Sequence, residues 1–146
     1  MTVDDIFLTI VIPCYNEERN IRLGALENVS SYLRRQKYPA EVIIVDDGSN
    51  DDSSALLKKI SAENNNFIYL KKRHQGKAAA VTAGVLKARG RYILFSDLDQ
   101  ATPINQLEKL FPYLHRPQKA RPKKLQRDKK EFGNYIEKRF QLIFRK

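Results

Sequence analysis

The stretch EVIIVDDGS, residues 41–49, decides the fold class, because a run of apolar side chains ends abruptly in an acidic pair and a glycine. β-Branched, apolar residues without polar alternation are typical of a strand that is covered on both faces, as in a parallel sheet. Asp46, Asp47 and Gly48 predict the turn that ends this strand. Open parallel sheets bind ligands outside the carboxyl ends of their strands, so the acidic pair lies where chemistry is expected.

Alternating strands and helices continue on both sides of this stretch. Apolar runs predict further strands at residues 7–12, 67–70 and 92–95. Between the strands, helices are predicted over about residues 16–36, from the second strand to about residue 63, over 77–88, and after Pro103. The order β-α-β-α-β-α-β-α predicts an α/β fold with a mainly parallel sheet, helices on both faces and right-handed crossovers.

The composition excludes several classes of protein. The 146 residues include one Cys, so we expect neither a disulfide framework within the chain nor a cysteine-based zinc cluster. No apolar run approaches the ~20 residues of a membrane span, and the N-terminus lacks the basic segment of a secretory signal. We therefore expect a protein of the cytoplasm, which is a reducing compartment.

The net charge of +10 belongs to the C-terminal part of the chain. Residues 1–114 hold 15 Lys/Arg and 14 Asp/Glu, whereas residues 115–146 hold 12 and 3. We divide the chain accordingly into an α/β domain, residues 1–114, and a basic linker with an amphipathic helix, residues 115–146. Because the α/β domain is nearly neutral, no nucleic-acid partner is expected; a tail that bound nucleic acid would do so in a salt-dependent way.

Residues 131–146 predict the amphipathic helix, because apolar side chains recur at every fourth position: Phe132, Ile136, Phe140 and Phe144. Lysines and arginines flank this stripe. Such a helix can lie on an anionic membrane surface, which predicts peripheral contact with the cytoplasmic face of a membrane. The alternative is a helix that packs on the sheet.

Two carboxylates, one residue apart, follow the last predicted strand. Asp97 and Asp99 can both turn toward one hard cation, and oxygen ligands of this kind suit Mg²⁺ or Mn²⁺ that bridges to phosphate. Such a metal neutralises the charge that develops on a leaving diphosphate. Arg73 and Lys77 are candidates for the same phosphates, and Gly76 permits close approach of a phosphate to a helix N-terminus. The alternative is a solvated loop with ordinary acidic residues at the start of a helix.

Asp46 and Asp47 also have two interpretations. They form a turn before a helix whose N-cap candidates are residues 49–52. Alternatively, a carboxylate accepts a hydrogen bond from the imide N–H of a nucleobase, with Tyr15 packed beside the base.

Other features exclude competing functions. Cys14 has no evident base beside it, which argues against a thiol nucleophile, and His74 is expected to be simply exposed. The first strand is not followed by G-x-G-x-x-G, which argues against a dinucleotide oxidoreductase. A receiver-type signalling domain also carries an acidic pair, but that pair follows the first strand rather than the second.

Four segments together resemble the N-terminal half of the family 2 glycosyltransferases of the GT-A fold, and are most similar to dolichyl- or polyprenyl-phosphate glucosyltransferases. The segments are IVIPCYNEE at 10–18, VIIVDDGS at 42–49, GK at 76–77 followed by small residues up to Gly90, and YILFSDLD at 92–99. They occur in the family's order over about residues 7–114.

The resemblance implies a Rossmann-like GT-A fold and inverting transfer of a hexose from a nucleotide sugar, UDP-glucose, to a polyprenyl or dolichyl phosphate or to a glycan. Asp46 would hold the base, and Asp97 and Asp99 would be the catalytic D-x-D element that carries Mg²⁺ or Mn²⁺. The remaining residues that the resemblance assigns to the nucleotide-sugar pocket are Pro13, Tyr15, Glu17, Asp47, Gly76 and Lys77.

The sequence departs from the family pattern after Leu114. Family members continue with a further half that supplies a Gly-Ser-Arg segment, the acceptor site and often a later acidic residue as general base, and the sequence shows none of these. The chain therefore resembles a truncated member. The competing interpretation is a truncated, non-catalytic domain that binds a nucleotide sugar or regulates a partner, with a basic tail that contacts a membrane or that partner.

Overall fold

The computed structural model describes residues 6–99, 103–109, 111 and 141–144. Five strands form one sheet in the order β3-β2-β1-β4-β5. The first four strands are parallel, and they lie where the apolar runs predicted them: β1 (Leu8–Cys14), β2 (Ala40–Asp46), β3 (Phe67–Lys71) and β4 (Tyr92–Phe95). The predicted α/β fold with a mainly parallel sheet is confirmed.

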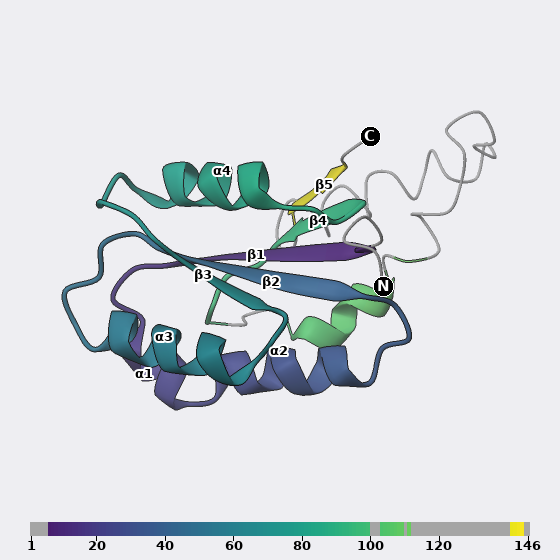
Figure 1. The fold of residues 1–146 in the computed structure, drawn as a ribbon, viewed down its shortest axis with the longest axis horizontal. Coiled ribbons are helices and arrows are strands. Elements are labelled where there is room, and N and C mark those ends of the chain that lie inside the picture. The colour runs from purple at the N-terminus through teal and green to yellow at the C-terminus, as the bar shows by residue number, and fades with distance from the viewer. Residues whose placement is uncertain (1–5, 100–102, 110, 112–140, 145–146) are drawn as a thin grey trace.

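Helices cover both faces of this sheet (Figure 1). One face carries α4 (Lys77–Lys87). The opposite face carries α1 (Glu18–Arg22), α2 (Ala25–Arg34), α3 (Ser53–Glu63) and the 3-10 helix η1 (Ile104–Lys109). Within the part of the chain that the structure describes, no helix has the length and apolar character needed to cross a membrane.

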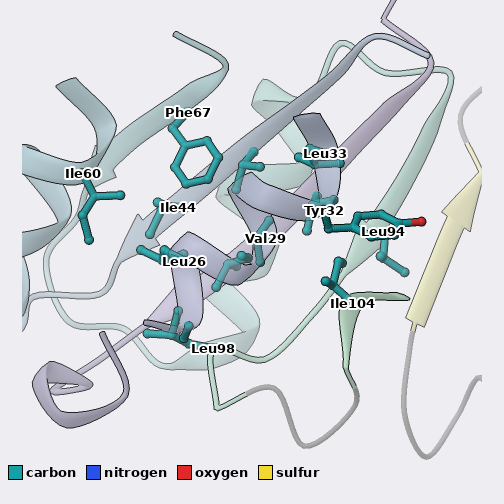
Figure 2. Close-up of a cluster of buried hydrophobic side chains, with 14 of the residues drawn as sticks. Leu26, Val29, Tyr32, Leu33, Ile44, Ile60, Phe67, Leu94, Leu98 and Ile104 are labelled. Carbon is teal, nitrogen blue, oxygen red and sulfur yellow. The ribbon is translucent and has the colours of Figure 1, made fainter. Parts of the chain in front are cut away.

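The first predicted helix is divided in two at Gly24. We predicted a single helix over about residues 16–36, but α1 ends at Arg22 and α2 begins at Ala25. Gly24 has φ +87°, a left-handed conformation that glycine adopts without a steric penalty. The division turns α2 so that Leu26, Val29 and Leu33 pack against the sheet (Figure 2).

Each face of the sheet has its own core. Facing α2 and α3, the strands contribute Ile10, Ile44 and Leu94, all fully buried, and Leu98 joins them from the loop after β4 (Figure 2). On the other face, the layer of side chains between the sheet and α4 is thinner, because Gly84 has no side chain and lets the backbone of α4 approach β1 closely. A Cβ atom at residue 84 would lie 2.3 Å from Cγ1 of Val11.

A buried network of hydrogen bonds connects the amino-terminal ends of β1 and β2 to the residues before β4. Thr9 donates a 2.8 Å hydrogen bond to the carboxylate of Glu41, which is 1% exposed. Arg89 donates to the same carboxylate through its backbone N–H and through two guanidinium N–H groups, at 2.7–2.9 Å. The N–H of Gly90 donates to the Thr9 hydroxyl at 2.9 Å. α4 ends at Lys87, and Gly90 permits close contact of the following backbone with β1.

The prediction of a helix over residues 131–146 is wrong for residues 141–144. These form β5 (Gln141–Phe144), which pairs antiparallel with β4. The edge of β4 offers unpaired backbone groups, and their pairing with β5 overrides the four-residue periodicity. The predicted linker and most of the predicted helix lie outside the described residues, so the boundary at residue 114 stays a prediction.

The segment after Pro103 forms η1 rather than an α-helix. Leu107 of η1 is buried, and Phe111 packs at the edge of the core.

Candidate functional site

The loops after β1, β2 and β3 lie together at one end of the sheet (Figure 1). The ring of Tyr15 stacks on the ring of His74, with centroids 4.2 Å apart and planes inclined by 20°. Nδ1 of His74 lies 2.9 Å from Oδ2 of Asp47. Lys77, three residues after His74, contacts Asp97 in the loop after β4, with Nζ of Lys77 2.5 Å from Oδ1 of Asp97. We call these five residues, Tyr15, Asp47, His74, Lys77 and Asp97, the rim.

Asp47 is the residue that joins the two ends of the rim. Its carboxylate, 3% exposed, accepts hydrogen bonds from the N–H groups of Gln75 at 2.9 Å and Gly76 at 2.8 Å. His74 Nδ1 also lies 3.1 Å from the carbonyl oxygen of Asp47. Burial alone would raise the pKa of Asp47, but these hydrogen bonds and His74 outweigh burial and lower the pKa below its ordinary value.

Asp46 faces the opposite side of the sheet and is fully buried. Its carboxylate accepts hydrogen bonds from the N–H of Ser49 at 2.9 Å, from the hydroxyl of Tyr69 at 2.8 Å and from the hydroxyl of Ser54. Together these bonds lower the pKa of Asp46 despite its burial. A base N–H would reach this carboxylate only after neighbouring side chains move, so the role of Asp46 as the base acceptor stays a prediction.

The lowered pKa values of Asp46 and Asp47 predict a loss of stability in acid. The unfolded chain takes up protons as the pH falls through 3.8, the ordinary value, while both folded carboxylates remain ionised until lower pH. Their contribution is therefore complete above about pH 5 and is lost progressively below that. Asp47→Asn should cost about 2 kcal/mol of unfolding free energy at pH 7, because hydrogen bonds to a charged acceptor are lost.

Urea unfolding at pH 7 and at pH 3 measures this effect. The difference in stability between the two pH values should be smaller in Asp47→Asn than in the wild type. Asp52→Asn is the matched control, because Asp52 is 70% exposed and forms only a surface ion pair with Arg22. A pH dependence unchanged in Asp47→Asn would contradict the assignment.

Residues 49–52 tie the loop after β2 to the loop after β1, and the carboxylate of Asp51 accepts a 2.9 Å hydrogen bond from the N–H of Ser53, the first residue of α3. The N–H of Asn16 donates to the Ser49 hydroxyl at 3.0 Å, and the side-chain carbonyl of Asn16 accepts from the N–H of Asn50 at 2.8 Å. Asn16 adopts φ +52°, which an asparagine tolerates. Asp52 is the N-cap residue of α3, but its side chain makes no capping hydrogen bond.

Pro13 and Glu17 flank Tyr15 and are both partly exposed. Pro13 lies within β1 opposite Val45. The N–H of Glu17 donates to the Ser53 hydroxyl at 2.9 Å, and its carboxylate accepts from the amide of Asn20 at 2.6 Å. Pro13 and Glu17 thus lie near Tyr15 in the chain, and their assignment to a nucleotide-sugar pocket stays a prediction.

Cys14 is fully enclosed beneath the rim. Burial, with the nearby carboxylates of Asp46 and Glu17, raises the pKa of its thiol to about 12. A thiol with this pKa is not ionised near neutral pH and is a poor nucleophile. The structure therefore agrees with the argument against Cys14 as a nucleophile.

Gly76 and Lys77 mark the start of α4. Gly76 has φ +94° and ψ 165°, a conformation that is essentially restricted to glycine, and among the described residues no atom beyond its chain neighbours lies within 4 Å of the place where a Cβ would be. Space for a ligand is therefore present above Gly76, although its N–H already donates to Asp47.

Asp97 and Asp99 are both exposed, and the buried Leu98 between them holds the loop against the core. The described part of the chain contains no cluster of three or more His, Cys, Asp or Glu side chains suited to a metal ion. A cation bound to Asp97 and Asp99 would therefore take its other ligands from water and from the substrate, which is how Mg²⁺ is usually held.

His74, Ser54 and Tyr69 are the residues of the site that sequence reasoning missed. Each is joined to the acidic pair by the three-dimensional packing of separate loops. A histidine two residues before a glycine carries no recognisable signal by itself.

A shallow hollow of about 540 Å³ lies next to the loop after β1, lined by Asn16, Glu18, Arg19, Arg22, Leu23 and Asp51.

Comparison with known proteins shows what the chain is similar to in sequence and fold. The family model described as "Glycosyl transferase family 2" matches residues 9–143. A dolichyl-phosphate beta-glucosyltransferase of Saccharomyces cerevisiae is 40% identical over 73% of this chain and 34% of its own length. The corresponding protein of Dictyostelium discoideum is 33% identical over 80% of this chain and 38% of its own length. The chain thus spans about a third of the length of these relatives.

Solved structures share the fold. A mannosyltransferase of Pyrobaculum calidifontis, in complex with GDP-Man and Mn²⁺, superposes with a TM-score of 0.63 at 25% identity, covering 75% of this chain and 32% of that protein. The glucosyl-3-phosphoglycerate synthase of Mycobacterium tuberculosis superposes with a TM-score of 0.57 at 20% identity, covering 75% of this chain and 40% of that protein.

Proposed function

Because the chain belongs to glycosyltransferase family 2, we propose that its rim binds the nucleoside diphosphate part of a sugar nucleotide, UDP-glucose, together with Mg²⁺ or Mn²⁺. The proposed reaction is inverting transfer of the glucosyl group to the phosphate of a dolichyl or other polyprenyl phosphate. Relatives named dolichyl-phosphate beta-glucosyltransferases support this choice of acceptor.

The observation that carries the proposal is the continuous set of contacts from Tyr15 to Asp97. An aromatic pair at one end suits a planar base, and a lysine with a carboxylate at the other end suits a diphosphate with a cation. Asp47 links the two ends through His74 and the N–H of Gly76. These contacts support the proposal that one nucleoside diphosphate engages both ends.

The donor set fits the proposed metal. Asp97 and Asp99 offer exposed carboxylate oxygens, the ligands that Mg²⁺ and Mn²⁺ prefer. When bound, the metal would neutralise negative charge on the leaving diphosphate. Lys77, whose Nζ pairs with Asp97 and lies 5.2 Å from the centroid of the Phe95 ring, would contact the same diphosphate.

The acceptor places a small demand on the protein. The oxygen of a lipid phosphate is already anionic near neutral pH, so it can attack the sugar without a general base. The proposal therefore needs no general base in addition to Asp97 and Asp99, the two exposed carboxylates that it assigns to the metal.

Isothermal titration of the chain with UDP and Mn²⁺ tests donor binding, with EDTA and GDP as comparisons. We expect heat that depends on the metal and a preference for UDP over GDP. Absence of heat would contradict the proposal. Transfer of radiolabelled glucose from UDP-glucose to dolichyl phosphate tests the reaction; binding without transfer would favour the non-catalytic donor-binding domain.

A further inference from the structure

We propose that His74 is a positioning residue that holds the ring of Tyr15 in the plane on which the base of the donor packs. The inference rests on the proposed function and extends it to a residue outside the predicted site. It identifies the Tyr15–His74 pair, rather than Tyr15 alone, as the surface that recognises a planar base.

The imidazole of His74 is fixed in orientation by Asp47. Nδ1 lies 2.9 Å from a carboxylate oxygen and 3.1 Å from the carbonyl oxygen of Asp47, and both of these atoms are acceptors. Nδ1 must therefore carry a proton and donate it, which selects one tautomer of the neutral ring. Because Asp47 is itself buried, its carboxylate is a rigid anchor for a ring that is otherwise 55% exposed.

The backbone of His74 is fixed as well. Gly48, with φ +78°, lies so close to the backbone of His74 that a Cβ at residue 48 would be 2.8 Å from the backbone nitrogen of His74. The next two N–H groups, those of Gln75 and Gly76, both donate to Asp47. His74 is therefore held at its backbone and at its ring, although it belongs to a surface loop.

Tyr15 depends on this support. Its side chain is 41% exposed, and the nearly parallel ring of His74 covers one of its faces. With centroids 4.2 Å apart, the two rings leave no room for a third ring between them. A base must therefore pack on an outer face of the pair, which stays in place when the ligand binds.

Three variants of His74 separate the ring contact from the hydrogen bond. His74→Ala removes both, His74→Asn keeps a donor for Asp47 without a ring, and His74→Phe keeps a ring without the donor. We expect about three- to tenfold weaker binding of UDP with Mn²⁺ in the Ala and Asn variants, from loss of an aromatic pair, and partial recovery in the Phe variant. Gln75→Ala, an exposed neighbour that contacts Asp47 only through its backbone, should bind UDP normally.

Titration with pyrophosphate and Mn²⁺ distinguishes positioning from a general structural effect. Pyrophosphate has no base, so its affinity should be the same in the wild type and in all His74 variants. Equal weakening of pyrophosphate and UDP would overturn the proposal, as would UDP binding by the Ala variant at wild-type affinity. Failure of the wild type to bind UDP would instead contradict the proposed function, on which this inference rests.

Proton NMR provides a second measurement on the unmodified chain. The sequence has two histidines, so the imidazole spectrum holds two sets of signals, and a His115→Gln variant assigns them. The His74 protons should be shifted upfield by the Tyr15 ring, should lose this shift in Tyr15→Leu, and should keep it when UDP is added. Loss of the shift on addition of UDP would mean that the base displaces His74, which would overturn the proposal.

Discussion

Replacing both Asp97 and Asp99 by asparagine is expected to weaken the binding of UDP in the presence of Mn²⁺ by about 10- to 100-fold. Asparagine keeps the size of each side chain but removes the charge that a divalent cation requires. Both residues are exposed, and the Lys77–Asp97 pair is about half exposed, so the unfolding free energy should change by less than about 1 kcal/mol. Titration calorimetry with UDP measures the affinity, and urea unfolding measures the stability.

Two controls make this result specific. In EDTA, the wild type and the double variant should bind UDP equally weakly, because the variant lacks only the contribution of the metal. Asp52→Asn removes an exposed carboxylate away from the rim and should bind UDP like the wild type. A double variant with wild-type affinity in Mn²⁺ would show that these carboxylates do not hold the metal.

The second large effect is expected from Gly90→Ala, with a loss of about 3 kcal/mol of unfolding free energy. The added Cβ would lie 2.5 Å from the backbone nitrogen of Thr9 and 2.7 Å from its hydroxyl oxygen. β1 is hydrogen-bonded on both sides, to β2 and to β4, so its backbone cannot move away without weakening these hydrogen bonds. The clash also disturbs the hydrogen bonds that Thr9 makes to Glu41 and Gly90.

Gly76→Ala is the informative comparison. Gly76 has open space around it but a backbone conformation that alanine rarely adopts, so its cost should be about 1–2 kcal/mol and arise from strain alone. Urea unfolding of the two variants should therefore rank Gly90→Ala as the more damaging. The opposite order would contradict the close packing of Gly90 against β1.

The four parallel strands could be predicted because each is encoded locally, by a run of apolar residues that are buried on both faces. The break at Gly24 could not be predicted, since glycine is also tolerated within a helix at a modest cost. β5 was mistaken for part of a helix because its conformation depends on the free edge of β4, a partner distant in sequence.

The same distinction applies to the site. The proximity of Tyr15, Asp47, Lys77 and Asp97 could be predicted because each follows a strand of the parallel sheet. The contribution of His74 depends on the strand order, which brings its loop against the loop after β2. No local pattern in the sequence contains that information.

The way in which Asp47 is held has a consequence for how such enzymes can diversify. Two of its hydrogen-bond donors are main-chain groups, at Gln75 and Gly76, and a main-chain donor is present whatever side chain the residue carries. Mutation at position 75 can therefore change the side chain beside the rim while the main-chain hydrogen bonds to Asp47 are preserved. The side chain at position 75, in the loop between β3 and α4, can therefore vary during evolution at little cost to the stability of the fold.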